Sequence, residues 1–306
     1  MNVKDKLEVM VPTHIINVDS DPYIENEMIG KTIRSCHWGI KGLDVKFTIC
    51  PDARLKKSHP NLMLEYEKYL DKLCKELISE GINCSVREEN GDTLRGNWIK
   101  FIEECERPYM MFLEHDWKFD KQINISDVIQ CFENNSNINY LRLSKFDITQ
   151  GVVKNLAHGL NWDWMFEEVK PVDVIPVSKI SFFSGNPHFV RVSFYREKVL
   201  KWLEKYCPLN LSKGASHLEK DLKKVEMQQI DEFRNCGLSN ERSGWYKNGE
   251  HWGHLWPLSD SSGIGKGCPD CEQAIRRQHE LWGNYMYGHV GESAIVSHLG
   301  DWCAKK

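Results

Sequence analysis

The first 113 residues alternate short apolar runs with longer stretches in which apolar residues recur every three or four positions. The short runs predict strands at residues 7–13, 45–50, 82–87 and 109–113, and the longer stretches predict helices at 25–36, 62–79 and 93–105. Strands that alternate with helices form a mainly parallel sheet with right-handed crossovers and with helices packed on its faces. The order therefore predicts an α/β fold.

The second half of the chain is less regular. We expect strands at residues 138–143 and 189–195, helices at 197–206, 218–233 and 272–282, and a long loop region at 235–270. No segment has the composition of a clean linker. The sequence therefore predicts one domain over residues 1–306 with an irregular C-terminal elaboration.

Two acidic residues follow the strand predicted at 109–113. Glu114 and Asp116 flank His115 at the carboxyl end of that strand, where open α/β sheets bind ligands. If the segment stays extended, side chains two residues apart point the same way, and two such carboxylates suit a divalent cation that holds a diphosphate. The alternative is a strand that ends in an acidic turn.

Other polar residues precede this acidic motif in a definite order. Ile33-Arg34-Ser35 lies on the first helix, Asp52 follows the second strand, and Arg95-Gly96-Asn97 opens the third helix. Together with Glu114-His115-Asp116, this order resembles that of nucleotide-sugar glycosyltransferases of the GT-A fold, and most closely the large family 2. The resemblance covers about the first 120 residues and consists of motif order.

The resemblance implies a hexosyltransferase-type enzyme that uses Mn²⁺ or Mg²⁺. Its donor would be a nucleotide-diphospho-sugar bound by residues 1–120, and residues 121–306 would bind a carbohydrate or glycoconjugate acceptor. The implied donor-binding residues are Thr13, Asp52, Arg95, Asn97, Glu114 and His115. The implied metal ligands are Asp116, Glu114 and His298, with His289 as the alternative to His298. Glu114 stands where the family has Asp, so Asp116 is favoured for direct metal contact, with Glu114 on the ribose or on a metal-bound water.

The family also carries an acid at a helix start that deprotonates the acceptor hydroxyl in inverting enzymes. Glu219 matches this position and Asp221 is the alternative. Ser216 and Glu219 also have the spacing of a capping box, so Glu219 could serve only to cap the helix. The turn-rich segment at residues 182–188 resembles the acceptor-side loop of such enzymes.

A second group of residues has the spacing of zinc ligands. His251 and His254 are followed by Cys268 and Cys271, and paired His-x2-His and Cys-x2-Cys motifs could form a tetrahedral site. The alternative is a loop with incidental thiols. A structural zinc here could fasten the loop at 235–270.

Composition limits the remaining classes. The chain has 40 basic and 44 acidic residues and a formal net charge of −4, which indicates neither a nucleic-acid partner nor a polybasic membrane anchor. No signal peptide or transmembrane segment is evident, and the 11 cysteines lack the density of a disulfide scaffold, so we expect a cytoplasmic protein, with peripheral membrane association open.

Two rival functions belong to other classes. A nucleotidyltransferase would normally show a glycine-rich, basic loop after the first strand, and residues 14–19 contain no such loop. A non-catalytic carbohydrate-binding protein derived from a transferase is the other alternative.

Overall fold

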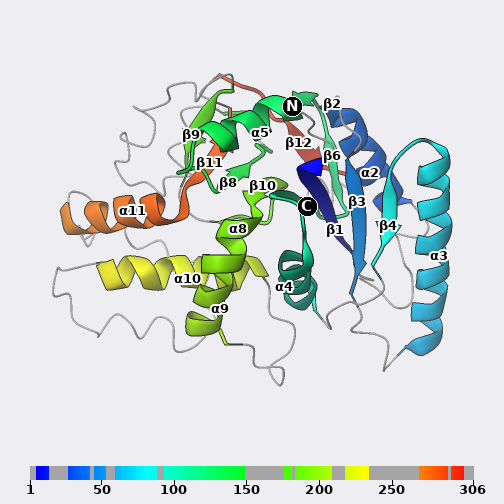
Figure 1. The fold of residues 1–306 in the computed structure, drawn as a ribbon, viewed down its shortest axis with the longest axis horizontal. Helices are drawn as coiled ribbons and strands as arrows, with labels where there is room; N and C mark the ends of the chain where they lie inside the picture. The colour runs from blue at the N-terminus through cyan, green and yellow to red at the C-terminus, as the bar shows by residue number, and fades with distance from the viewer. Residues whose placement is uncertain are drawn as a thin grey trace, which may run out of the picture.

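A mixed sheet lies at the centre of the molecule, flanked by helices (Figure 1). The computed structural model describes residues 5–13, 27–41, 45–52, 59–87, 93–145, 147–148, 175–180, 183–208, 218–233, 269–288 and 291–299. Within these ranges the sheet has eight strands, in the order β4-β3-β1-β5-β10-β8-β11-β9. They are β1 (Leu7–Thr13), β3 (Lys46–Pro51), β4 (Cys84–Val86), β5 (Tyr109–Phe112), β8 (Tyr140–Arg142), β9 (Val177–Lys179), β10 (His188–Arg191) and β11 (Asn284–Tyr287).

Most strands of this sheet run in the same direction. The four that the alternating first half supplies, β4, β3, β1 and β5, are mutually parallel, whereas β10 and β9 run antiparallel to their neighbours. β8 and β11 are parallel to each other. This arrangement confirms the predicted fold class, a mainly parallel α/β sheet flanked by helices.

Helices cover both faces of the sheet and bury two apolar cores. One core contains apolar residues of α2 (Met28–Gly39), α3 (Pro60–Ser79) and α5 (Ile125–Asn134). The other contains residues of α4 (Leu94–Glu104), α10 (Leu218–Phe233) and the continuous helical stretch of α8 (Val192–Phe194), η3 (Tyr195–Val199) and α9 (Leu200–Tyr206). α11 (Pro269–Trp282) packs against α10.

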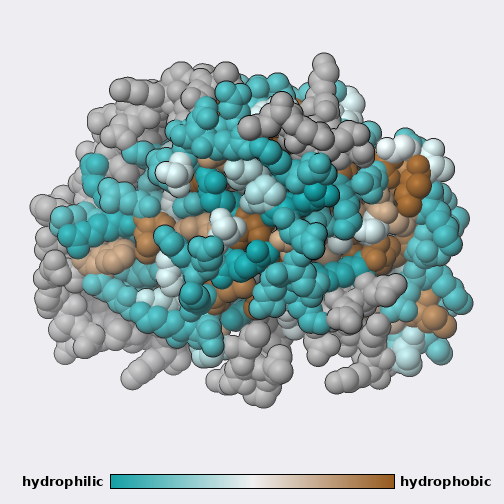
Figure 2. All heavy atoms as spheres, in the orientation of Figure 1, coloured by the Kyte–Doolittle hydropathy of each residue, from teal (hydrophilic) through white to brown (hydrophobic). Residues whose placement is uncertain are grey.

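The molecular surface agrees with this burial. The face drawn in Figure 2 is mainly hydrophilic, and its apolar areas are small and separate. Among the described residues, no helix combines the length and apolar character needed to cross a membrane.

Two small sheets join distant segments beside the main one. β6 (Trp117–Phe119) pairs antiparallel with β12 (Val296–His298), and β2 (Ile40–Lys41) pairs parallel with β7 (Ile123–Asn124). The first pairing brings residues near the C-terminal end of the described chain against the segment that follows Glu114-His115-Asp116. It therefore helps to build the site described below.

The predicted elements are confirmed along the first half, with ends that differ by a few residues. In the second half, the strand predicted at 189–195 was wrong beyond residue 191, because the chain turns helical at Val192. The helix predicted at 197–206 was too short, since the helical stretch begins at that same residue. The loop region predicted at 235–270 lies almost entirely outside the described residues.

Gly283 separates α11 from β11 and has a conformation that favours glycine. Its φ is +62°, and a Cβ placed there would lie 1.9 Å from the Asn137 carbonyl oxygen. We expect Gly283→Ala to lower the free energy of unfolding by at least about 3 kcal/mol, because backbone strain and a steric clash add. Urea denaturation measures this loss.

Gly81 supplies a matched control for that variant. Its φ is +83°, but a Cβ there would meet no atom within 4 Å. Gly81→Ala should therefore show only the conformational part of the loss, about 1–2 kcal/mol. Equal losses in the two variants would contradict the clash at Gly283.

Candidate functional site

The carboxyl ends of β1, β3 and β5 meet at one edge of the sheet. Thr13 and Pro51 are register partners, and the Asp52 backbone N–H donates to the Thr13 carbonyl oxygen at 2.8 Å. Both Thr13 and Asp52 are buried. The Thr13 hydroxyl is buried without a hydrogen-bond partner in the described part of the chain. The edge thus offers a threonine hydroxyl and, on the neighbouring strand, an acid, and a donor-binding role for them stays a prediction.

The acidic motif does not continue β5 in an extended form. The strand ends at Phe112, and the chain turns at His115 and Asp116. The expectation that this segment continues the strand in an extended form was therefore wrong. Glu114 lines a pocket together with Glu219, whereas the Asp116 carboxylate contacts His298.

Asp116 and His298 are brought together by the β6–β12 pair. His298 is the register partner of Trp117, its ring lies 3.8 Å from that indole ring, and its Nδ1 lies 3.4 Å from Asp116 Oδ2. The Leu299 N–H also donates to the Asp116 carbonyl oxygen at 2.7 Å. Burial acts to raise the pKa of Asp116, but the hydrogen bond from His298 and the nearby imidazoles outweigh it, so this pKa lies below its ordinary value.

Asp116 and His298 supply two side chains of the kinds that bind metal ions, a carboxylate and an imidazole. Asp116 Oδ1 is buried and has no hydrogen-bond partner among the described residues, so one carboxylate oxygen is left for a ligand beside an imidazole. Over the described ranges, no cluster of three or more His, Cys, Asp or Glu side chains is placed to hold a metal ion. Mg²⁺ commonly takes one or two carboxylates and completes its shell with substrate phosphates and water, so two protein ligands fit such an ion.

His115 fixes the turn between the two acids. Its Nδ1 donates to the Pro12 carbonyl oxygen at 3.1 Å, and the Thr32 hydroxyl donates to the His115 carbonyl oxygen at 2.6 Å. Burial lowers the pKa of His115, although the charge of Asp116 and the hydrogen bond to Pro12 act to raise it. These contacts tie the turn to β1 and α2, and they set where Glu114 and Asp116 lie.

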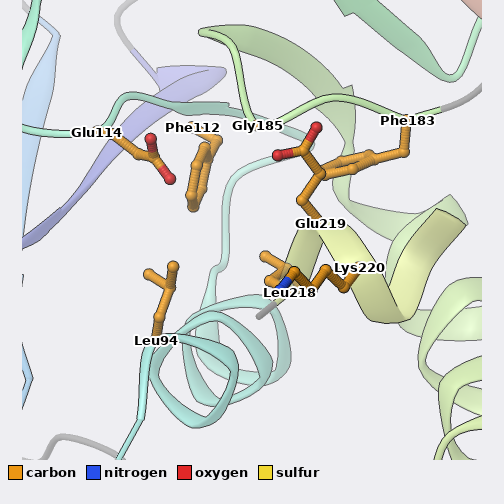
Figure 3. A pocket seen from close by; sticks show the side chains of 8 residues that line it. All are labelled: Leu94, Phe112, Glu114, Phe183, Gly185, Leu218, Glu219 and Lys220. Atoms are coloured by element: carbon orange, nitrogen blue, oxygen red, sulfur yellow. The ribbon is translucent and has the colours of Figure 1, made fainter. Parts of the chain in front are cut away.

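A pocket of about 130 Å³ lies on the α4 and α10 side of this edge (Figure 3). Its lining comes from four segments: Leu94; Phe112 and Glu114; Phe183 and Gly185; and Leu218, Glu219 and Lys220. Burial, followed by the charges of Asp116 and Glu219, raises the pKa of Glu114 to about 8. The pocket therefore contains two carboxyl groups from elements far apart in the sequence.

Glu219 lies in the first turn of α10, as predicted. Its Oε1 accepts a hydrogen bond from the Lys223 ammonium at 2.7 Å. Its Oε2 lies toward Gly185, because a Cβ at that glycine would be 3.4 Å away. The other implied base, Asp221, is not among the residues that line the pocket.

Arg95 and Asn97 join α4 to its neighbours. The buried Arg95 guanidinium donates to Asp221 Oδ2 at 2.9 Å and to the Cys207 carbonyl oxygen at 2.6 Å. Asn97 Nδ2 donates to the Pro51 carbonyl oxygen at 3.0 Å. These contacts fix α4 against α10 and against the end of β3, and a donor-binding role for either residue stays a prediction.

Asp221→Asn should therefore cost stability. The substitution leaves the Arg95 guanidinium buried without its counter-charge, and we expect the free energy of unfolding to fall by roughly 3 kcal/mol. Asp71→Asn is the control, since it breaks the exposed Lys75–Asp71 pair and should leave the free energy of unfolding nearly unchanged. A denaturant titration that finds the two variants alike would argue against a structural role for Asp221.

Glu226 is a buried acid that the sequence did not indicate. Its carboxylate accepts hydrogen bonds from the Phe183 backbone N–H at 2.8 Å, from Gln278 Nε2 at 3.0 Å and from Asn284 Nδ2 at 2.8 Å. One side chain of α10 thus holds the pocket wall at Phe183 together with α11 and β11. Burial raises the pKa of Glu226 to about 8, although these hydrogen bonds and Lys223 act to lower it.

This pKa makes the stability of the protein depend on pH. Because the folded protein binds the Glu226 proton more tightly than the unfolded chain, the free energy of unfolding should fall as pH rises from about 5 to about 8, by at most about 1.4 kcal/mol per pH unit. Glu226→Gln cannot ionise and should show a shallower slope. Denaturant titrations across this range measure both slopes, with the exposed Glu280→Gln on α11 as control. Equal slopes for Glu226→Gln and wild type would contradict the prediction.

Two predictions fall outside the described residues. His251, His254, Cys268 and the side chain of Cys271 lie there, so the zinc site stays a prediction. The loop at residues 14–19, whose composition argued against a nucleotidyltransferase, also lies outside.

Comparison with known proteins gives a likeness of structure but not of sequence. No protein-family model and no curated protein matches the chain. Among solved structures, the mannosyltransferase PcManGT from Pyrobaculum calidifontis, in complex with GDP-Man and Mn²⁺, is 9% identical with a TM-score of 0.41, over 73% of this chain and 51% of that one. Residues 1–349 of S. aureus TarS are 13% identical with a TM-score of 0.40, over 90% and 83%.

Mouse xyloside xylosyltransferase 1 is 11% identical with a TM-score of 0.38, over 73% of this chain and 82% of that one. The present chain spans about half the length of PcManGT, and it covers 29% of a longer TarS structure. At identities this low the likeness concerns the fold.

Proposed function

We propose that this protein is a metal-dependent, hexosyltransferase-type glycosyltransferase. It would move a sugar from a nucleotide-diphospho-sugar to an acceptor hydroxyl, with inversion at the anomeric carbon. One observation carries the proposal. Asp116 contacts His298 at one edge of the sheet, and a pocket lined by Glu219 lies beside this pair. Residues 1–120 would bind the donor, and residues 121–306 would complete the site and bind the acceptor.

Each part of the site has a role in this reaction. Asp52 and Thr13 would hold the nucleoside, since they lie side by side at the ends of β3 and β1. Asp116 and His298 would hold Mn²⁺ or Mg²⁺, which would stabilise negative charge on the diphosphate leaving group. Glu219 would accept the proton of the acceptor hydroxyl, which places the acceptor in the pocket.

A thermal-shift screen of nucleotide-sugars, with and without Mn²⁺, tests the proposal. The correct donor should raise the melting temperature only when Mn²⁺ is present, because the metal ion would hold the diphosphate. A ligand at a hundred times its Kd stabilises the folded state by about 2.7 kcal/mol, which such a screen detects. The screen also identifies the base and the sugar. If no nucleotide-sugar shifts the melting temperature under either condition, the proposed function is wrong.

A further inference from the structure

The side chains of Glu114 and Glu219 enter the same part of the pocket from two different elements. Glu114 follows β5, Glu219 lies in the first turn of α10, and Gly185 lies between them (Figure 3). A Cβ on Gly185 would be 3.7 Å from Glu114 Oε1 and 3.4 Å from Glu219 Oε2. The glycine therefore leaves open the space that the two carboxyl groups share.

Glu114 lines the pocket, and the charge of Asp116 is near enough to act on its pKa. Asp116 and His298 contact each other, and neither lines the pocket that Glu114 helps to form. The turn that His115 fixes lies between the two acids in the chain. The two carboxylates of the motif accordingly serve two neighbouring parts of the site.

The pocket has a definite chemical preference. A carboxyl group offers at least one acceptor oxygen in either protonation state, so the two together can accept hydrogen bonds from two hydroxyl groups. Two carboxyl groups and a single lysine, Lys220, line the pocket, and this excess of acidic groups disfavours an anionic ligand. Leu94, Phe112, Phe183 and Leu218 give the walls apolar and aromatic surface, against which the C–H groups of a sugar ring can pack.

The volume limits how much of a ligand enters. At about 130 Å³, the pocket is smaller than a typical site for a whole small molecule, which has roughly 300–1,000 Å³. That space suits the hydroxyl-bearing edge of one sugar ring.

We propose that Glu114 and Glu219 together bind two hydroxyl groups of a neutral sugar acceptor, and that Glu114 serves the acceptor and not the metal ion. This inference rests on the proposed function, because it specifies the acceptor of that reaction. It makes Gly185 a specificity-determining residue, since any side chain there would enter the space between the two carboxyl groups.

The first test measures Mn²⁺ affinity by electron paramagnetic resonance in the absence of any sugar. We expect Asp116→Asn to weaken Mn²⁺ binding at least tenfold and Glu114→Ala to change it less than twofold. Equal losses in the two variants would make Glu114 a metal ligand and overturn the inference. Unchanged affinity in Asp116→Asn would instead count against the metal site of the proposed function.

The second test measures sugar binding without donor or metal, by calorimetry or saturation-transfer NMR. The probes are the methyl glycosides of glucose, galactose and mannose, with methyl glucuronide as the anionic counterpart. We expect a neutral glycoside to bind wild type more tightly than the glucuronide does, and Glu114→Ala to weaken it about tenfold.

Gly185→Ala is a second variant that keeps both carboxyl groups. It tests the same pocket if Glu114→Ala folds poorly. Its methyl group would make only ordinary contacts, so the fold should be retained while neutral glycosides bind more weakly and Mn²⁺ binds as in wild type. The inference is wrong if the glucuronide binds as tightly as the neutral glycosides, or if neither variant weakens their binding.

Discussion

Asp116→Asn should lower kcat/KM for sugar transfer at least about a thousandfold, because a metal ion supplies several kcal/mol of charge stabilisation in the transition state. Asparagine keeps the size of the side chain but removes the negative charge that faces His298 and that would hold the cation. The fold should be retained, since the backbone contact from Leu299 to the Asp116 carbonyl oxygen does not use the side chain. Steady-state kinetics with the donor found in the screen, at several Mn²⁺ concentrations, measure the loss.

Asp120→Asn is the matched control. Asp120 follows β6, four residues after Asp116, and its carboxylate pairs with Lys118 at the surface. The control should retain kcat/KM within about twofold. If Asp116→Asn retained similar activity, Asp116 would not be a metal ligand and the proposed mechanism would fail.

The strands β4, β5 and β8 and the helix α3 could be predicted from the sequence, but the short strands β6 and β12 and the helix α5 were missed. α3 carries an apolar stripe over 20 residues, so its periodicity is unmistakable. β6 and β12 have three residues each, and their pairing joins Trp117 to His298 across the length of the chain. His298 could therefore be matched only through the family resemblance, and the structure then places it beside Asp116.

The motifs indicated the candidate residues, but they could not give the direction of the side chains. Asp52, Asp116 and Glu219 lie at the sheet edge and pocket where they were expected. The positions of Glu114 and Asp116 depend on a turn fixed by His115, whose partners are Pro12 and Thr32, and no local pattern encodes such contacts.

Glu226 was missed for a similar reason. On a helix with many charged residues, an acid looks like part of a solvated surface. Its partners, Phe183, Gln278 and Asn284, come from other parts of the chain. Glu226 is buried because α11 and β11 pack over it. The local sequence of α10 does not indicate this burial.

Glu219→Gln should lower kcat by about 10²–10⁴-fold, which is the usual contribution of a general base. Glutamine has nearly the same shape and can still accept a hydrogen bond, but it cannot take the proton of the acceptor hydroxyl. The loss should therefore appear mainly in kcat, with a smaller change in KM. The Lys223 ion pair is also lost, but it is partly exposed and contributes little to stability.

Two variants separate this role from a structural one. Glu232→Gln removes an exposed carboxylate from the last turn of the same helix and should retain wild-type kcat. Asp221→Asn should lower stability through Arg95 while the folded fraction retains most of its kcat. If Glu219→Gln kept kcat within about threefold while Asp221→Asn lost it, the base would be Asp221, and the acceptor would have to approach from the side of α4 instead of through the pocket at Gly185.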